Sequence, residues 1–116
     1  MKKSLVEEAQ VVLARAQAIA TVLSERREEL DLNMEVEALL RAGINATTFA
    51  IDRYVAFAVG ATQSRVAMGY LGEAKEGLNR SVRQLHRRTN RAIAEISRLG
   101  GQKEGRKAAR YISRIA

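Results

Sequence analysis

Apolar residues recur along the chain with the period of an α-helix. The first stripe advances by alternating steps of four and three residues and comprises Leu5, Ala9, Val12, Ala16, Ile19, Leu23 and, after Arg26, Leu30. Such steps keep side chains on one face of a helix. The acids near the end of this stripe are unfavourable at a helix C-terminus, where the dipole favours cations. The pattern therefore predicts a first helix that ends near Leu30.

A second helix is predicted over about residues 34–59. Asn33 can cap its start, and its first turn holds acids, which the helix dipole favours at that end. Small residues recur along it at a four-residue step and return at a later turn: Ala38, Ala42, Ala46, Ala50 and Ala58. A ridge of small residues lets two helix backbones approach closely. We therefore expect this ridge to pack against the alanines of the first helix in an antiparallel hairpin.

Gly60 marks the next expected boundary, because polar residues that can cap a new helix follow it. A third helix is then predicted from about Gln63 to Leu99. In the alternative, the second helix continues through Gly60 and the glycines beyond it loosen its middle. Gly100-Gly101 is the clearest stop signal in the chain, since glycine adopts the left-handed geometry that ends helices. The chain thus divides into a helical bundle domain, residues 1–99, and a Gly-Gly hinge with a basic C-terminal segment, residues 100–116.

Composition supports an all-helical fold. There is no proline, alanine is the commonest residue type, and no alternating strand pattern occurs. We predict an all-α antiparallel bundle of three long helices plus a short basic C-terminal helix. Alanine-rich helices bury little apolar area within one chain, so we expect oligomerisation, as a homodimer or higher oligomer, to complete the bundle.

Charge divides the chain into two unlike halves. The sequence has 20 Lys and Arg against 13 Asp and Glu, for a net charge of +7. Residues 1–60 hold seven of the bases and nine of the acids, whereas residues 61–116 hold 13 bases and four acids. An excess of this size in one half is typical of a chain that binds a polyanion.

The predicted third helix separates its charged residues from its apolar ones. At 100° of rotation per residue, an apolar seam lies within about 60° of Leu78. The seam comprises Leu78, Val82, Leu85, Thr89, Ala92, Ile93, Ile96 and Leu99. Opposite it lies an arginine stripe of Arg80, Arg83, Arg87, Arg91 and Arg98, with Arg88 and Gln84 on its shoulder. Neighbouring guanidinium groups of the stripe are about 5 to 10 Å apart along the axis, a spacing that suits nucleic-acid phosphates.

Bases return after Gly101. They are Lys103, Arg106, Lys107, Arg110 and Arg114. Their apolar edge is too short for a stable isolated helix, so this segment is expected to become ordered on a partner. Together with the arginine stripe and Arg88, these bases form the predicted nucleic-acid-binding surface. Aromatic residues are few, so contact with the backbone is expected rather than reading of bases.

The predicted function is binding of a DNA or RNA backbone, or of an acidic protein, by a non-catalytic accessory or adapter. Charged helix faces are also typical of solvated surfaces and of subunit contacts. The alternative is therefore a homo-oligomeric assembly protein with no nucleic-acid role. A basic amphipathic C-terminus can also lie on anionic lipid, but this one lacks the Trp, Phe and Leu residues that drive insertion.

Arg80 and His86 are separated by five residues. This spacing resembles the Arg-x(4–6)-His motif of HEPN-domain ribonucleases, which are small helical bundles that dimerise. The resemblance implies that Arg80 and His86 activate a ribose 2′-hydroxyl and steady the phosphate. It covers these two residues alone, and Ser81 stands where the family commonly has Asn, Asp or His. On a helical wheel the pair is about 120° apart, which disfavours a joint site within one helix.

Other chemistry is not indicated by the sequence. Cysteine is absent and histidine occurs once, so we predict no thiolate nucleophile, no metal site and no cofactor. No apolar run approaches the ~18 residues of a membrane span. Acids at positions 7 and 8 interrupt the start of the chain, so no export signal is expected and the predicted location is the cytoplasm.

Overall fold

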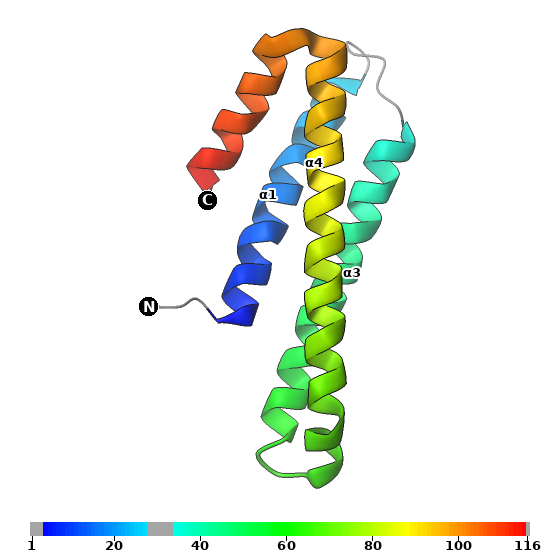
Figure 1. The fold of residues 1–116 in the computed structure, drawn as a ribbon, viewed down its shortest axis with the longest axis vertical. Helices are drawn as coiled ribbons and strands as arrows, with labels where there is room; N and C mark the ends of the chain where they lie inside the picture. The colour runs from blue at the N-terminus through cyan, green and yellow to red at the C-terminus, as the bar shows by residue number, and fades with distance from the viewer. Residues whose placement is uncertain (1–3, 28–33, 116) are drawn as a thin grey trace.

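The chain forms a bundle of long helices. The computed structural model describes residues 4–27 and 34–115, with side chains described as far as Arg98. Helix α1 spans Leu5–Glu25, α3 spans Met34–Gly60 and α4 spans Arg65–Ile115. No strand occurs in these ranges, so the predicted all-α class is confirmed. Figure 1 shows α3 and α4 as a long antiparallel hairpin, with α1 lying along one part of it.

Local hydrogen bonds define the ends of α1. The Ser4 hydroxyl accepts a hydrogen bond from the Glu7 amide at 3.1 Å, and acids occupy the first turn. At the other end, the Arg26 amide donates to the Val22 carbonyl at 3.0 Å. The helix thus ends at Glu25, and the predicted end near Leu30 and cap at Asn33 lie outside the described residues.

The turn predicted at Gly60 is confirmed, and the alternative of one continuous helix is wrong. The amides of Gln63 and Ser64 both donate to the Gly60 carbonyl at 2.9 Å, which turns the chain before α4 begins at Arg65. A Cβ on Gly60 would lie 3.0 Å from the Cβ of Ala67, so the two helices meet too closely there for a side chain. This contact fixes the position of the turn.

The C-terminal part of α4 differs from the prediction. Helical structure continues through Gly100-Gly101 to Ile115, so the stop at these glycines and the separate short helix after them are not observed as distinct elements. The ribbon bends sharply in its orange part instead (Figure 1). Glycine tolerates helical dihedrals as well as turn geometry, so a bend need not interrupt the hydrogen-bonded ladder.

The core lies where α4 meets α1 and α3. The main cluster joins Ala16, Ile19, Ala20 and Leu23 of α1, Val36 and Leu40 of α3, and Leu85, Ala92 and Ile96 of α4. A smaller cluster toward the hairpin end joins Ala9, Ile51 and Leu78. Val82 and Ile93 of the apolar seam pack against these clusters and Thr89 is buried, so the seam is confirmed for its members up to Ile96.

Most of the predicted alanine ridge of the second helix does not pack in the core. Ala38, Ala42 and Ala46 are exposed, whereas Ala50 packs against the smaller cluster. Helix α3 instead buries Val36, Leu40, Gly43, Thr47 and Ile51, on a neighbouring face. Leucine and isoleucine remove more apolar surface from water than alanine does, so the face that carries them is the one that faces the core.

Gly43 allows α3 and α4 to cross closely. A Cβ at this position would lie 3.1 Å from Leu85 Cδ1 and 3.4 Å from Arg88 Cδ. Leu85 is fully buried, so its side chain has little room to move. Gly69, Gly72 and Gly77 of α4 have no such neighbour within 4 Å, and the helix continues through them.

Glu37 is a nearly buried acid held by two arginines. Its side chain is 7% exposed, and Arg27 Nη2 donates to its two carboxylate oxygens at 2.6 and 2.7 Å. Arg41 adds a contact at 3.2 Å from the following turn of α3. Hydrogen bonds from Arg27 lower the pKa of Glu37 most strongly, against the opposing effect of burial. The carboxylate thus joins the start of α3 to the residue beyond the end of α1.

Substituting Gly43 tests the close helix crossing. We expect Gly43→Val to lower the free energy of unfolding by about 1 to 3 kcal/mol, because the new side chain overlaps Leu85. Gly72→Val is the matched control and should leave stability unchanged or raise it by a few tenths of a kcal/mol, since valine favours helix more than glycine does. Urea unfolding of both variants gives these values, and equal effects at the two positions would contradict the crossing.

The Glu37 carboxylate should make stability depend on pH. Because its pKa is lowered in the folded state, its contribution is present above the unfolded pKa and is lost as pH falls through the folded pKa. We expect Glu37→Gln to cost about 1 kcal/mol at pH 7. The difference in the free energy of unfolding between the wild type and this variant should shrink below about pH 4.3, the usual pKa of a glutamate. Urea unfolding across pH measures it, and a difference that persists at pH 2 would contradict the assignment.

Candidate nucleic-acid interface

The arginine stripe lies on the outer face of α4. The seam holds the opposite side of the helix against α1 and α3, so the stripe is turned away from the core. All five of its members are exposed: Arg80, Arg83, Arg87, Arg91 and Arg98. The arrangement of the two faces is the one that helical periodicity predicts.

Four arginines of the stripe have no charged partner among the described side chains. Ion pairs occur at Arg27, Arg41 and Arg98, whereas no described carboxylate lies against Arg80, Arg83, Arg87 or Arg91. The unpaired part of the stripe runs from Arg80 to Arg91, 11 residue steps or about 16 Å of helix. These guanidinium groups therefore keep their full set of hydrogen-bond donors for an external ligand.

Arg98 differs from the rest of the stripe. Its Nη2 lies 2.7 Å from Glu95 Oε1, and its Nε donates to Oε2 at 3.3 Å. Hydrogen bonding to Glu95 raises the pKa of Arg98. This pair neutralises charge at the C-terminal end of the stripe.

Arg88 makes a contact between helices, and its assignment to the nucleic-acid surface stays a prediction. Its Nη1 donates to the Leu39 carbonyl at 2.9 Å, and its side chain is half-buried beside Gly43. The absence of a Cβ at Gly43 leaves room for the guanidinium between the helices. Its shoulder position on the wheel and a glycine within the apolar face of α3 are the sequence signals for this contact.

The C-terminal bases cannot be placed at the level of side chains. Lys103, Arg106, Lys107, Arg110 and Arg114 belong to the last part of α4, whose side chains lie outside those that the structure describes. Their assignment to the nucleic-acid surface stays a prediction.

His86 lies beside Arg15 rather than beside Arg80. A cavity of about 70 Å³ between α1 and α4 is lined by Val12, Arg15, His86, Thr89, Asn90 and Ile93. Arg15 Nε is buried and makes no hydrogen bond. An adjoining space of about 340 Å³ is lined by Val12, Val82, Arg83, His86 and Arg87. Arg80 lines neither, so these cavities do not unite the pair on which the HEPN resemblance rests, and ribonuclease activity stays an alternative that nothing here tests.

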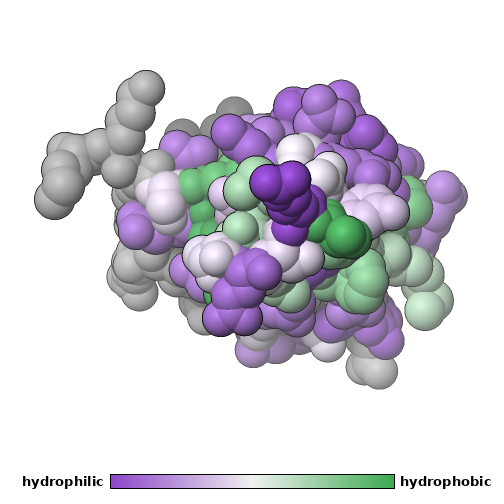
Figure 2. Space-filling view, turned by 90° about the horizontal axis from the view of Figure 1, so that it is seen from below, coloured by the Kyte–Doolittle hydropathy of each residue, from purple (hydrophilic) through white to green (hydrophobic). Residues whose placement is uncertain are grey.

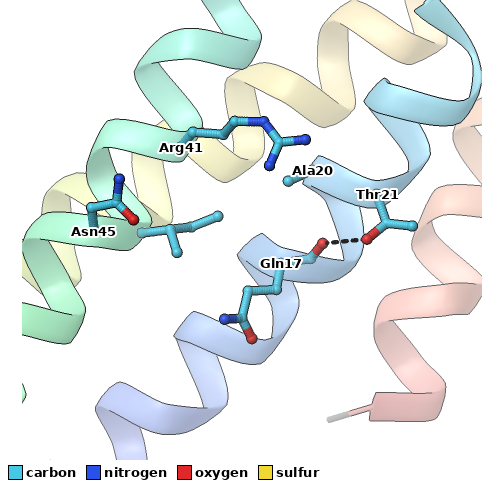
Figure 3. Close-up of a pocket in the computed structure, with 6 residues that line it drawn as sticks. Gln17, Ala20, Thr21, Arg41 and Asn45 are labelled. Carbon is cyan, nitrogen blue, oxygen red and sulfur yellow. Dashed lines mark hydrogen bonds between the residues drawn. The ribbon is translucent and has the colours of Figure 1, made fainter.

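A further cavity separates α1 from α3. It measures about 300 Å³ and is lined by Gln17, Ala20, Thr21, Arg41, Ile44 and Asn45 (Figure 3). The Thr21 hydroxyl donates to the Gln17 carbonyl at 3.0 Å, and Arg41 is engaged by Glu37. No acid or histidine lines this space, so it offers no acid–base pair for catalysis.

Neither a metal-binding cluster nor a membrane-spanning helix is present in the described part of the chain. No group of three or more His, Asp or Glu side chains is placed to hold a metal ion there. Within the same residues, no helix has both the length and the apolar character needed to cross a membrane.

Comparison of the whole chain with protein-family models, with curated proteins and with solved structures finds no match. Inference about function therefore rests on the arrangement of this chain's own residues.

Proposed function

We propose that the protein binds the phosphate backbone of a nucleic acid through the arginine stripe of α4, as a non-catalytic accessory or adapter. The observation that carries this proposal is the row of four exposed arginines without carboxylate partners. A solvated helix face usually mixes both signs of charge, and such pairs stabilise the helix. Repulsion among like charges in this row is relieved when phosphates bind.

The geometry favours a polyanion with regularly spaced charges. The stripe is carried on one helix that the core holds in place, so the spacing of its guanidinium groups is set before binding. Arginine donates two parallel hydrogen bonds to a phosphate, and neutralising several phosphates releases counterions. An acidic protein can satisfy the same charges and is the rival ligand.

The proposal includes the basic C-terminal segment. Residues 100–116 would extend the cationic surface beyond Arg98 and become ordered along the nucleic acid. We propose the cytoplasm as the place of action, where a chain without cysteine needs no oxidising compartment.

The proposal also includes self-association. A homodimer places two arginine stripes on one particle, and linked weak contacts bind far more tightly than single ones. The alternative function, a structural assembly protein without nucleic-acid binding, draws support from the exposed apolar residues of α3 and of the hairpin end.

Removing three arginines tests the proposal. We expect the wild-type protein to bind RNA or duplex DNA at low salt, with a slope of log affinity against log salt near 0.9 per phosphate neutralised on B-DNA. The combined variant Arg83→Gln, Arg87→Gln and Arg91→Gln should lower that slope by about 3 and abolish binding near physiological salt. Fluorescence anisotropy with labelled probes measures both quantities.

A matched control removes the same charge elsewhere. Arg53→Gln, Arg65→Gln and Lys75→Gln together lower the net charge equally but lie at the hairpin end, so binding should fall far less. Circular dichroism checks that both triple variants remain helical. Equal losses in the two variants would indicate attraction to net charge alone, and absence of wild-type binding at low salt would favour the assembly protein.

A further inference from the structure

Helix α3 carries exposed large apolar side chains outside its buried row. Met34, Phe49, Val55 and Val59 are 65%, 70%, 41% and 63% exposed. At 100° per residue, all four fall within an arc that runs from about 60° to about 180° from Leu40. We call this arc, which also holds the exposed polar residues Asn45 and Thr48 and the charged residues Arg41 and Asp52, the outer α3 face.

The outer α3 face is unlike a solvated helix surface. No charged residue occurs from Ala42 to Ile51, nor from Tyr54 to Ser64, although 28% of the chain is charged. A helix that is apolar on opposite sides is typical of one buried on both sides, and exposed apolar patches mark interaction surfaces. Near the hairpin end the patch continues onto α4 through exposed Val66, Met68 and Tyr70. Figure 2 views the molecule from that end and shows hydrophobic residues lying open among hydrophilic ones.

The spacing of the two charges on the face allows them to pair with those of a second copy, and Arg41 also contacts Glu37 of its own chain. Arg41 and Asp52 are 11 residues apart, which is about three helical turns, or about 16 Å, and places them within about 20° of each other around the helix. In an antiparallel pair of α3 helices related by a two-fold axis, each Arg41 can face Asp52 of the partner subunit. The same axis forms this pair twice.

The register that pairs these charges also matches the apolar residues. Its two-fold axis passes between Ala46 and Thr47, because Arg41 and Asp52 are equally far from that point along the helix. Met34 then lies level with Val59 of the partner subunit. Phe49 lies close to Ala42 of the partner subunit, where the small side chain leaves room for the ring. One axis therefore satisfies the charges and the apolar contacts together.

We propose that the outer α3 face binds a second copy of this chain, with the two α3 helices antiparallel. Two exposed alanines of the face, Ala38 and Ala56, favour a helix as the occupant, because small side chains let helix backbones approach to about 8 to 10 Å. A lipid surface gains nothing from small residues and prefers a basic face, whereas this one holds one arginine and one aspartate. This inference specifies the surface of the proposed oligomer and rests on self-association, but not on nucleic-acid binding.

Charge reversal tests the contact and its register. In sedimentation and light-scattering measurements without nucleic acid, we expect the full chain to have twice its monomer mass of 12.8 kDa. Arg41→Asp or Asp52→Arg alone places like charges opposite each other twice and should weaken the dimer by about tenfold or more. When these two variants are mixed, each reversed residue meets its opposite, so a heterodimer should form.

Controls separate this effect from unfolding and from net charge. Glu25→Arg changes the charge as much as Asp52→Arg, on the exposed end of α1, and should leave the dimer intact. Arg41→Asp also breaks a contact to Glu37, so Phe49→Lys serves as a second variant that disrupts the face without touching that contact. Circular dichroism should show unchanged helicity in all of them.

Each outcome decides the proposal. A monomeric wild type at about 100 μM, single reversals that leave dimerisation unchanged, or a mixture that fails to associate would each overturn it. A dimer that binds no nucleic acid would reject the arginine stripe as a ligand site and leave this interface standing. A monomer that still binds nucleic acid would reject this interface and leave the arginine stripe standing as a ligand site.

Discussion

The burial of one side of α4 against both other helices is the constraint on which the structure depends. Leu78, Leu85 and Ile96 are fully buried along this seam, spaced by seven and eleven residues so that they stay on one face of the helix. Because α4 contributes to both core clusters, its rotation about its own axis is fixed. The same rotation turns the arginines outward, so the position of the cationic surface follows from apolar packing in the core.

Charged groups serve two separate purposes in this molecule. Glu37 and Arg88 make contacts between parts of the bundle, Glu37 with Arg27 beyond the end of α1 and Arg88 with the Leu39 carbonyl of α3. The unpaired arginines of the stripe make no such contacts and add mutual repulsion. Arginine on α4 therefore has two environments, one in contact with α3 and one open to solvent, and the second is the basis of the proposed anion binding.

Much of the fold follows from the sequence because its periodic signals are local. The helical class, the turn at Gly60 and the seam of α4 each depend on spacing within one segment, and each is confirmed. The prediction of which side of α3 faces the core is wrong, because the alanine ridge and the row containing Leu40 both have helical spacing. Which of two such rows is buried depends on competition for the surface of α4, which spacing alone does not express.

In the candidate site, too, local spacing predicts some features and long-range contacts decide others. Exposure of the stripe follows from its position opposite the seam, whereas the contact of Arg88 with the Leu39 carbonyl requires Gly43, on another helix, to leave space for a guanidinium. The pairing of Arg98 with Glu95 joins residues three positions apart on one helix, a spacing at which side chains meet. The shoulder position of Arg88 and the glycine of α3 permit the long-range contact, but neither specifies the carbonyl that Arg88 meets.

The short turn between α3 and α4 has a consequence for how the chain folds. Helices joined by four residues meet through contacts that are close in sequence, and closing a short loop costs little chain entropy. The hairpin is therefore expected to form early and rapidly, with α1 docking afterwards onto a surface already half assembled. During that interval the nascent hairpin presents apolar residues on two sides, which makes the moment before α1 arrives the most vulnerable to misassociation during synthesis.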